Sequence, residues 1–271
     1  MLRNQSKTFL DRTDAGRQLG QRLAGLRGQD VVVLGLPRGG VPVAFEVAKA
    51  LDAPLDVIVV RKLGVPFRPE LAMGAIGEGG ARVLDARILS RAHVTRDDLQ
   101  TVEREERQLL ERRLTRYRQG RTRADVQGRA VVGVDDGIAT RSTARVACQV
   151  ARQLGAARVI LAVPVAPART GASFTEADEI VCLISPRNFQ AVGHYYQDFS
   201  PTEDDEVVRL LDLLTRSATN TAPLNPGSKP NRPAVEPAGR QDQAQGSGGP
   251  GLHERSRHHR RSITWNESST K

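Results

Sequence analysis

Two adjacent carboxylates, Asp135 and Asp136, directly follow a β-branched run at residues 130–134. Neighbouring strand residues point to opposite faces, and both faces of a helix-covered sheet are buried, so two acids inside the strand would each carry a large desolvation cost. We therefore expect both acids just beyond the strand end, where they could bind a sugar diol or a hydrated Mg²⁺. The alternative is that one of them caps the helix that follows.

The residues after this acid pair are suited to binding an anion. Residues 137–143 read GIATRST and lead into an apolar stretch with helical spacing. Hydroxyls and backbone N–H groups at the start of a helix attract phosphate groups. The Gly-Lys-Ser/Thr pattern is absent from this segment, which excludes a Walker-type nucleotide loop.

The elements around this segment alternate between strand and helix. Short β-branched runs predict buried strands, and apolar residues at helical spacing predict the helices between them. The expected strands are 31–36, 57–60, 130–134, 159–163 and 180–184, and the expected helices are 11–27, 43–51, 95–118, 142–154, 168–172 and 203–214. This alternation predicts an α/β protein with a doubly wound, mostly parallel sheet, whose ligands bind at the carboxyl ends of the strands.

Composition divides the chain into two parts. Residues 1–216 have the pattern of one globular domain, whereas residues 217–271 are rich in Pro, Gly, Ser and Arg and predict a disordered basic tail. The formal net charge is +9, but acidic and basic residues are mixed through the domain, which argues against a nucleic-acid-binding protein. The basic run at 253–261 is either a solvated tail or a contact for RNA.

The sequence shows neither a secretion signal nor an apolar run of the roughly 18 residues that a membrane span needs. Cys148 and Cys182 lie within apolar patterns and are expected to be buried reduced thiols. These features predict a cytoplasmic protein without a membrane partner.

Three segments together resemble a known family. The segment VVGVDDGIATRST at 131–143 is similar to the phosphoribosyl-diphosphate (PRPP) motif of type I phosphoribosyltransferases, in which a strand, two acids and a small-residue turn precede two threonines three residues apart. LPRGGVPVAFEVA at 36–48 and RKLGVPFRPELAMGAIGE at 61–78 add to the match. Residues 1–216 as a whole resemble a bacterial phosphoribosyltransferase-like branch of this superfamily.

The resemblance implies a role for each matching residue. Asp135 and Asp136 would hold the ribose 2′- and 3′-hydroxyls and contact Mg²⁺ indirectly, through substrate or water. The 5′-phosphate would be cradled by residues at the helix start, namely Ala139, Thr140, Arg141, Ser142 and Thr143. The departing pyrophosphate would be bound by the loops after the first two strands, namely by Arg38, Gly39, Gly40, Arg61 and Lys62. The catalytic candidates are Asp135, Asp136 and Lys62.

A glycine- and proline-rich stretch, residues 61–84, interrupts the strand–helix alternation. It predicts a hairpin of strands 71–76 and 82–84 joined at residues 77–80. By the resemblance, residues of about 61–125 would form a flexible hood that shuts water out of the site. Residues 194–196, His-Tyr-Tyr, either stack on a base or pack within a C-terminal lobe.

One position departs from the family pattern. Arg141 stands where the motif has glycine, whose missing side chain leaves room for phosphate. The arginine either obstructs the 5′-phosphate or pairs with it bidentately.

The resemblance implies an enzyme that transfers a 5-phosphoribosyl group from PRPP to a nitrogenous base with Mg²⁺ and releases pyrophosphate, as in nucleotide salvage. The alternative is a non-catalytic regulator that binds PRPP or a nucleotide with the same fold. Transferases of this superfamily are often dimers, so a homodimer is compatible with the resemblance.

Overall fold

Six parallel strands form the central sheet of the protein, which is described by a computed structural model for residues 8–139, 141–168, 170, 174–220 and 264–265. Their spatial order is β2-β1-β6-β7-β8-β9, and all neighbouring pairs are parallel. The strands are β1 (Val31–Gly35), β2 (Leu55–Val57), β6 (Ala130–Val134), β7 (Arg158–Val165), β8 (Glu179–Ile184) and β9 (Thr264–Trp265). The predicted α/β architecture with a parallel sheet is confirmed.

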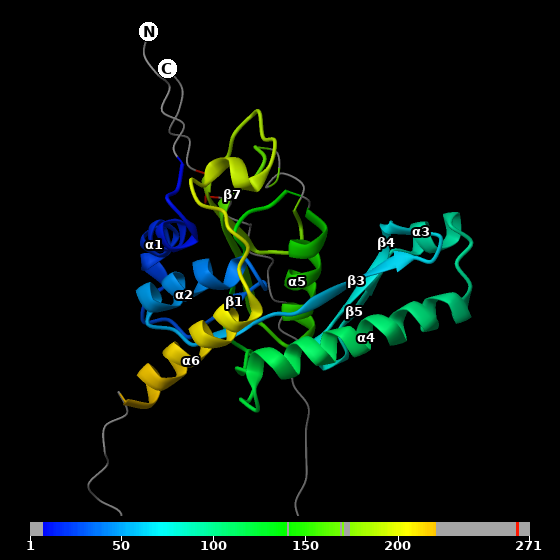
Figure 1. Ribbon diagram of the computed structural model, residues 1–271, viewed down its shortest axis with the longest axis horizontal. Coiled ribbons are helices and arrows are strands. Elements are labelled where there is room, and N and C mark those ends of the chain that lie inside the picture. Colours follow the sequence, from blue (N-terminus) through cyan, green and yellow to red (C-terminus); the bar gives the residue numbers. More distant parts are fainter. Residues whose placement is uncertain (1–7, 140, 169, 171–173, 221–263, 266–271) are drawn as a thin grey trace, which may run out of the picture.

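Helices cover both faces of this sheet (Figure 1). On one face lie α1 (Arg12–Arg22) and α2 (Gly40–Leu51), and on the other lies α5 (Arg141–Gln153). Because both faces are covered, alternate residues of β1 enter different cores: Val33 packs with α2, and Leu34 packs with the α5 side. This double burial explains why the strands read as unbroken apolar runs.

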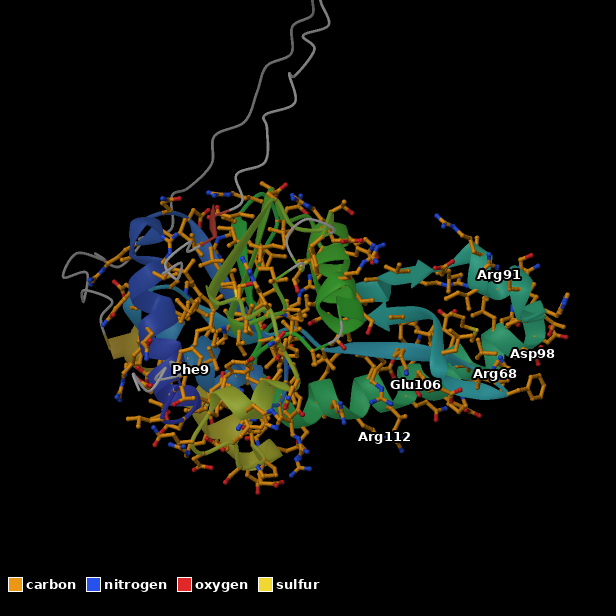
Figure 2. The ribbon with its side chains drawn as sticks, turned by 90° about the horizontal axis from the view of Figure 1, so that it is seen from above. Phe9, Arg68, Arg91, Asp98, Glu106 and Arg112 are labelled. Atoms are coloured by element: carbon orange, nitrogen blue, oxygen red, sulfur yellow. The ribbon has the colours of Figure 1, made fainter. Side chains whose placement is uncertain are left out.

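A second, antiparallel sheet of three strands projects from the body as an arm (Figures 1 and 2). It consists of β3 (Val60–Val65), β4 (Arg68–Gly77) and β5 (Arg82–Leu84), followed by α3 (Ala86–Arg91) and α4 (Arg96–Arg118). Thr95 and Asp98 form a reciprocal capping box that begins α4. Leu99, Leu110 and Tyr117 make the buried stripe of this otherwise polar helix. The predicted hairpin of 71–76 and 82–84 is confirmed.

The expected strand at 57–60 is wrong. Its residues divide between two sheets: β2 ends at Val57, and β3 of the arm begins at Val60. Ile58 and Val59 between them are buried as well. The apolar run is therefore continuous across a change of sheet, and hydrophobicity alone cannot show the break. Arg61 and Lys62 consequently lie inside β3 rather than in a loop at a strand end.

The ends of other helices differ modestly from the predicted ones. The first helix stops at Arg22 and is followed by a 3₁₀ turn at Ala24–Leu26. The closing helix, α6, extends over Asp204–Asn220 and so passes the expected domain boundary at residue 216. Of the expected helix at 168–172, Ala168 and Thr170 lie in a turn and the other positions fall outside the described residues.

Two residues of the expected tail also differ from the prediction. Thr264 and Trp265 pair with Val181 and Cys182 of β8 and form the edge of the sheet. Backbone pairing at an open sheet edge needs no apolar composition, so the tail's polar sequence did not reveal it. No helix in the described residues is long and apolar enough to span a bilayer.

The arm is anchored to the body by buried charge. The Arg118 guanidinium, at the end of α4, contacts Asp56 of β2 and Glu78 at the end of β4. All three side chains are at most 13% exposed. Arg121 adds an ion pair of 2.8 Å to Asp212 of α6, so the base of α4 is held from several directions.

Candidate functional site

The loops after β1 and β6 lie side by side at the carboxyl edge of the sheet. The two strands are neighbours, and Leu36 N donates a hydrogen bond of 2.8 Å to Val134 O just where both strands end. Asp135 therefore comes directly after the last strand residue, as predicted. The fold brings the acid pair together with the loop that contains Arg38, Gly39 and Gly40.

Glycine is required where this loop meets the acids. A Cβ on Gly39 would overlap Asp136 Oδ2, and a Cβ on Gly40 would lie 2.6 Å from Val134 O and 2.9 Å from Asp135 Cα. Side chains at these positions would therefore push the loop away from the carboxylates. The close approach depends on both glycines and leaves backbone, rather than side chains, facing the acid pair.

Arg38 supplies an exposed cation beside these glycines. Its side chain is 44% exposed, and its Nη1 lies 3.5 Å from Glu203 Oε2, a long contact between two solvated groups. Such a pair contributes little stability, and a ligand anion could replace the glutamate at small cost. The peptide bond between Pro37 and Arg38 is cis.

Each of the two acids uses one oxygen for the protein and leaves the other available. Asp135 Oδ1 accepts a hydrogen bond of 2.9 Å from Asp136 N. Asp136 Oδ2 accepts one of 2.9 Å from Arg12 Nε and lies 2.8 Å from Arg12 Nη2. Asp135 Oδ2 and Asp136 Oδ1 accept no hydrogen bond from any described residue. The recorded contacts of both acids are thus not with the first turn of α5, in contrast to the capping alternative.

Arg12 is a site residue that the sequence did not reveal. It stands at the start of α1 and is separated from Asp136 by 124 positions, although its side chain is only 12% exposed. Its Nη1 donates a hydrogen bond of 2.7 Å to Ser200 O, and its guanidinium lies 4.0 Å from the centre of the Phe199 ring. One of many arginines in a polar helix carries no local signal, and only the tertiary structure singles it out.

Burial raises the pKa of both acids, and the charge of Asp136 adds to the effect at Asp135. Burial raises the pKa of Asp135 well above its ordinary value, and the neighbouring charge of Asp136 raises it further. Burial also raises the pKa of Asp136, while the Arg12 guanidinium opposes that rise. Raised pKa values in adjacent carboxyls mean that a ligand which donates hydrogen bonds to them, or a cation near them, would relieve an existing cost.

Tyr196 holds the backbone of the acid pair from the C-terminal lobe. Its hydroxyl donates a hydrogen bond of 2.6 Å to Asp136 O. Its ring packs at 5.3 Å from Phe9 and 5.0 Å from Phe199, measured between ring centres. Burial raises the pKa of this phenol, which stays protonated as a donor. Of the two alternatives for residues 194–196, packing describes Tyr196.

The proposed phosphate segment begins α5 next to the acids. Ile138 is buried and its N donates to Val165 O at 2.9 Å, which fixes the turn between Asp136 and the helix. Ala139, Ser142 and Thr143 are exposed, and α5 begins at Arg141. Thr140 lies outside the described residues. A helix N-terminus with exposed hydroxyl residues faces solvent here, as an anion site requires.

Arg61 and Lys62 contact residues of the arm and not the acid pair. Arg61 Nε donates a hydrogen bond of 2.6 Å to Glu106 Oε2 of α4, and Lys62 Nζ lies 3.2 Å from Glu70 O. Both contacts fall within the arm, where Figure 2 labels Glu106. No recorded contact of either cation reaches the acid pair within the described residues. A role for them in binding pyrophosphate stays a prediction.

The described residues contain no cluster of three or more His, Cys, Asp or Glu side chains that could hold a metal by themselves. The two available carboxylate oxygens at the sheet edge nevertheless suit a hard cation whose other ligands are water or substrate oxygens. Both cysteines are free and buried, as expected.

A separate hollow of about 540 Å³ lies near the end of the arm. It is lined by Val65, Phe67, Leu71, Ile88 and Ala92 with Arg68 and Arg91, and the latter two mark its position in Figure 2. It contains no acid and none of the residues predicted for the site.

Comparison with known proteins agrees with this geometry. The model of the phosphoribosyl transferase domain family matches residues 10–197. Two Mycobacterium tuberculosis proteins, from strains CDC 1551 and H37Rv, carry the provisional name phosphoribosyl transferase and are each 56% identical to this chain over 225 residues. The match covers 83% of this chain and 51% of each relative, so the chain spans about half the length of these curated relatives.

A solved structure is also similar to this chain. The crystal structure of TT1426 from Thermus thermophilus matches with a TM-score of 0.67 and 45% sequence identity. That match covers 75% of this chain and 97% of TT1426. With the family model matching most of the chain and the acid pair, glycine loop and helix start brought to one sheet edge, this chain belongs to the phosphoribosyl transferase domain family.

Proposed function

We propose that this protein transfers a 5-phosphoribosyl group from PRPP to a nitrogenous base and releases pyrophosphate. The observation that carries the proposal is the acid pair, which meets a glycine loop close to the N-terminus of α5. Asp135 Oδ2 and Asp136 Oδ1 accept no hydrogen bond from any described residue. A sugar diol, a diphosphate and a monophosphate have matching partners there, at the strand ends where ligands of such sheets bind.

The ribose would be held by the acid pair. Its vicinal 2′- and 3′-hydroxyls would donate to Asp135 Oδ2 and Asp136 Oδ1, one hydroxyl to each carboxylate. Hydrogen bonds to ionised groups are about twice as strong as those between neutral groups. The second oxygen of each acid is already held by the protein, so both acceptors are oriented before substrate arrives.

The phosphates would lie on either side of the ribose. The first turn of α5, with Ser142 and Thr143, would take the 5′-phosphate through backbone N–H groups and hydroxyls. Arg38 and the Gly39–Gly40 backbone would take the pyrophosphate, since Arg38 is exposed and only loosely paired with Glu203. Ser142 and Thr143 are both exposed to solvent.

Magnesium fits this site as a partner of the substrate. Mg²⁺ favours a few carboxylate contacts together with water and phosphate oxygens, which the available oxygens of Asp135 and Asp136 allow. When bound, it would neutralise charge on the diphosphate. The chain's own residues would bind and orient the sugar while a base nitrogen attacks the anomeric carbon and the bond to the pyrophosphate oxygen breaks.

Arg141 is the observation that favours a second candidate, a non-catalytic protein that binds PRPP or a nucleotide. It occupies the position where the family motif has glycine, at the first residue of α5. If it obstructs productive binding of the 5′-phosphate, the ribose and diphosphate contacts could serve sensing rather than turnover. The base acceptor and a homodimeric assembly are further predictions of the resemblance.

The test combines binding and turnover. Calorimetry with Mg²⁺ and PRPP measures affinity, and pyrophosphate release with a panel of purine, pyrimidine and pyridine bases measures transfer. We expect PRPP to bind, Asp135→Asn to weaken binding at least tenfold, and the exposed arm variant Asp97→Asn to leave it unchanged. Binding without turnover on any base would favour the regulatory candidate, and absence of binding would refute both.

A further inference from the structure

We propose that Arg12 is a positioning residue of the ribose site, which holds one oxygen of Asp136 so that the other faces the ligand. This inference rests on the proposed function, because it assigns the orientation of an acid that would bind the ribose. It adds a residue from α1, outside the three segments that carry the family resemblance, to the working parts of the site.

Arg12 contacts only one of the two carboxylate oxygens of Asp136. Arg12 Nε and Nη2 both approach Asp136 Oδ2, at 2.9 and 2.8 Å, instead of spanning both carboxylate oxygens. A fork-on-fork pairing would occupy Oδ1 as well and would have to be broken by a sugar hydroxyl. The observed geometry leaves Oδ1 available, so substrate can bind while the ion pair persists.

Arg12 is itself held rigidly. Its third nitrogen, Nη1, donates to Ser200 O at 2.7 Å, and its guanidinium stacks 4.0 Å above the Phe199 ring. With only 12% of the side chain exposed, the cation has little freedom to swing into solvent. Rotation of the Asp136 carboxylate would break its contacts with Arg12, and Arg12 cannot follow the rotation because Ser200 O and the Phe199 ring hold it in place.

The strand-like pairing of the chain before α1 delivers Arg12 to this place. Phe9 N donates to Tyr195 O at 2.8 Å, and Gln197 N donates to Phe9 O at 2.8 Å. Tyr196, which lies between these two partners, also donates its hydroxyl to Asp136 O. Residues 195–197 therefore hold the backbone of Asp136 through Tyr196, and they hold the start of α1, with Arg12, through Phe9.

The positive charge of Arg12 also affects the ionisation of the acid pair. Two adjacent, largely buried carboxylates repel each other and disfavour the charged state that accepts hydrogen bonds best. Arg12 places a cation against Asp136 Oδ2, on the side of Gly39, and makes no recorded contact with Oδ1. It thus offsets the repulsion without occupying Oδ1.

A residue that prepares an acceptor acts on ground state and transition state alike. Its loss should raise the KM and the dissociation constant for PRPP more than it lowers kcat. A residue that merely stabilised the fold would alter the melting temperature without this split. A residue that contacted the leaving group would lower kcat instead.

The experiment compares Arg12→Met and Arg12→Lys with Arg17→Met in the full chain. Arg17 is a matched control because it lies on the same helix but its side chain is 65% exposed. Its ion pair with Glu46 is long, at 3.5 Å. By calorimetry with Mg²⁺ and PRPP, we expect Arg12→Met to weaken binding about tenfold, equivalent to about 1.4 kcal/mol. Arg12→Lys should be intermediate, and Arg17→Met should stay within twofold of the wild type.

A double-mutant cycle with Asp136→Asn tests whether Arg12 acts through that acid. If it does, adding an Arg12 substitution to Asp136→Asn should cause less than a twofold further loss. Equal losses in both backgrounds would show that Arg12 acts independently of Asp136 and would overturn the inference. If Arg12→Met does not fold, the cycle with Arg12→Lys gives the same decision.

The outcomes separate this inference from the proposed function. Wild-type protein that does not bind PRPP overturns both. Wild-type binding together with unchanged binding by Arg12→Met and Arg12→Lys overturns only the role of Arg12. A melting temperature shifted equally in Arg12→Met and Arg17→Met, with affinity lost only in the former, supports positioning.

Discussion

Two regions of the molecule bury pairs of acids, and they treat them differently. At the base of the arm, every carboxylate oxygen of Asp56 and Glu78 has a partner: Arg118 reaches both acids, and the backbone N–H groups of Val57 and Ala124 complete Asp56. At the sheet edge, Asp135 and Asp136 each leave one oxygen without a partner among the described residues. The difference is consistent with a structural role for Asp56 and Glu78 and with the ligand-binding role that we propose for Asp135 and Asp136.

The comparison also explains the energetic cost of the site. A buried acid whose hydrogen-bonding capacity is filled depends on its partners, because removing one of them leaves an uncompensated buried charge. A buried acid kept partly open is a source of instability in the absence of ligand. Asp56 and Glu78 are buried and Asp135 and Asp136 are partly buried, and the two pairs differ most in how many of their oxygens have partners.

The largest expected effect comes from removing the cation at the arm base. Arg118→Met should leave Asp56 and Glu78 buried without their counter-ion and lower the free energy of unfolding by about 3–5 kcal/mol. Urea denaturation followed by circular dichroism measures this. Arg112→Met, an exposed position of the same helix, should cost less than about 0.5 kcal/mol. Equal losses in the two variants would contradict the saturated-cluster interpretation.

A smaller effect is expected where the glycine loop meets the acids. Gly39→Ala places a Cβ against Asp136 Oδ2, so the loop must shift, at a cost of about 1–3 kcal/mol. PRPP affinity should fall along with stability, because the loop and the acid belong to one site. Gly25→Ala has open space around its added methyl and serves as the control in thermal denaturation and calorimetry. A Gly39→Ala protein with wild-type stability and affinity would show that the close approach is not needed.

Asp135→Asn should stabilise the protein at neutral pH while it weakens PRPP binding. The folded-state pKa of Asp135 is raised, so its stabilising contribution is complete below the unfolded pKa and is lost as pH rises through the folded value. At neutral pH the ionised carboxylate is therefore a net cost, which asparagine removes. The difference in stability between wild type and variant should vanish near pH 4, as measured by urea denaturation across pH. A variant less stable than wild type at pH 7 would refute this interpretation.

The smallest effect is expected at the brace on the Asp136 backbone. Tyr196→Phe removes the donor to Asp136 O but keeps the ring between Phe9 and Phe199, so it should cost about 1 kcal/mol. Tyr195→Phe is the matched control, because no hydrogen bond of its hydroxyl is recorded among the described residues. Thermal denaturation measures the melting temperatures of both variants. Identical values would show that the Tyr196 hydroxyl does not stabilise the backbone at Asp136.

Much of the fold was predictable because its signals are local. Strand 130–134 and helix 142–154 were recognised almost to the residue, since continuous β-branched runs and helical periodicity arise from burial on a covered sheet. The division of 57–60 between two sheets was not predictable, since both halves are equally buried. The bulges around Gly64 removed the alternation that would have marked β3 as a strand.

The sequence by itself determined the chemistry that is contiguous in the chain: an acid pair at a strand end, a glycine loop and a hydroxyl-rich helix start. Parallel strand order then brings such loops to one edge, so their proximity follows from the strand–helix alternation in the sequence. Only the tertiary structure decided which oxygens of the acids are available, and that Arg12, Tyr196 and Phe199 orient them. These residues meet across long separations through side-chain packing, for which local pattern contains no information.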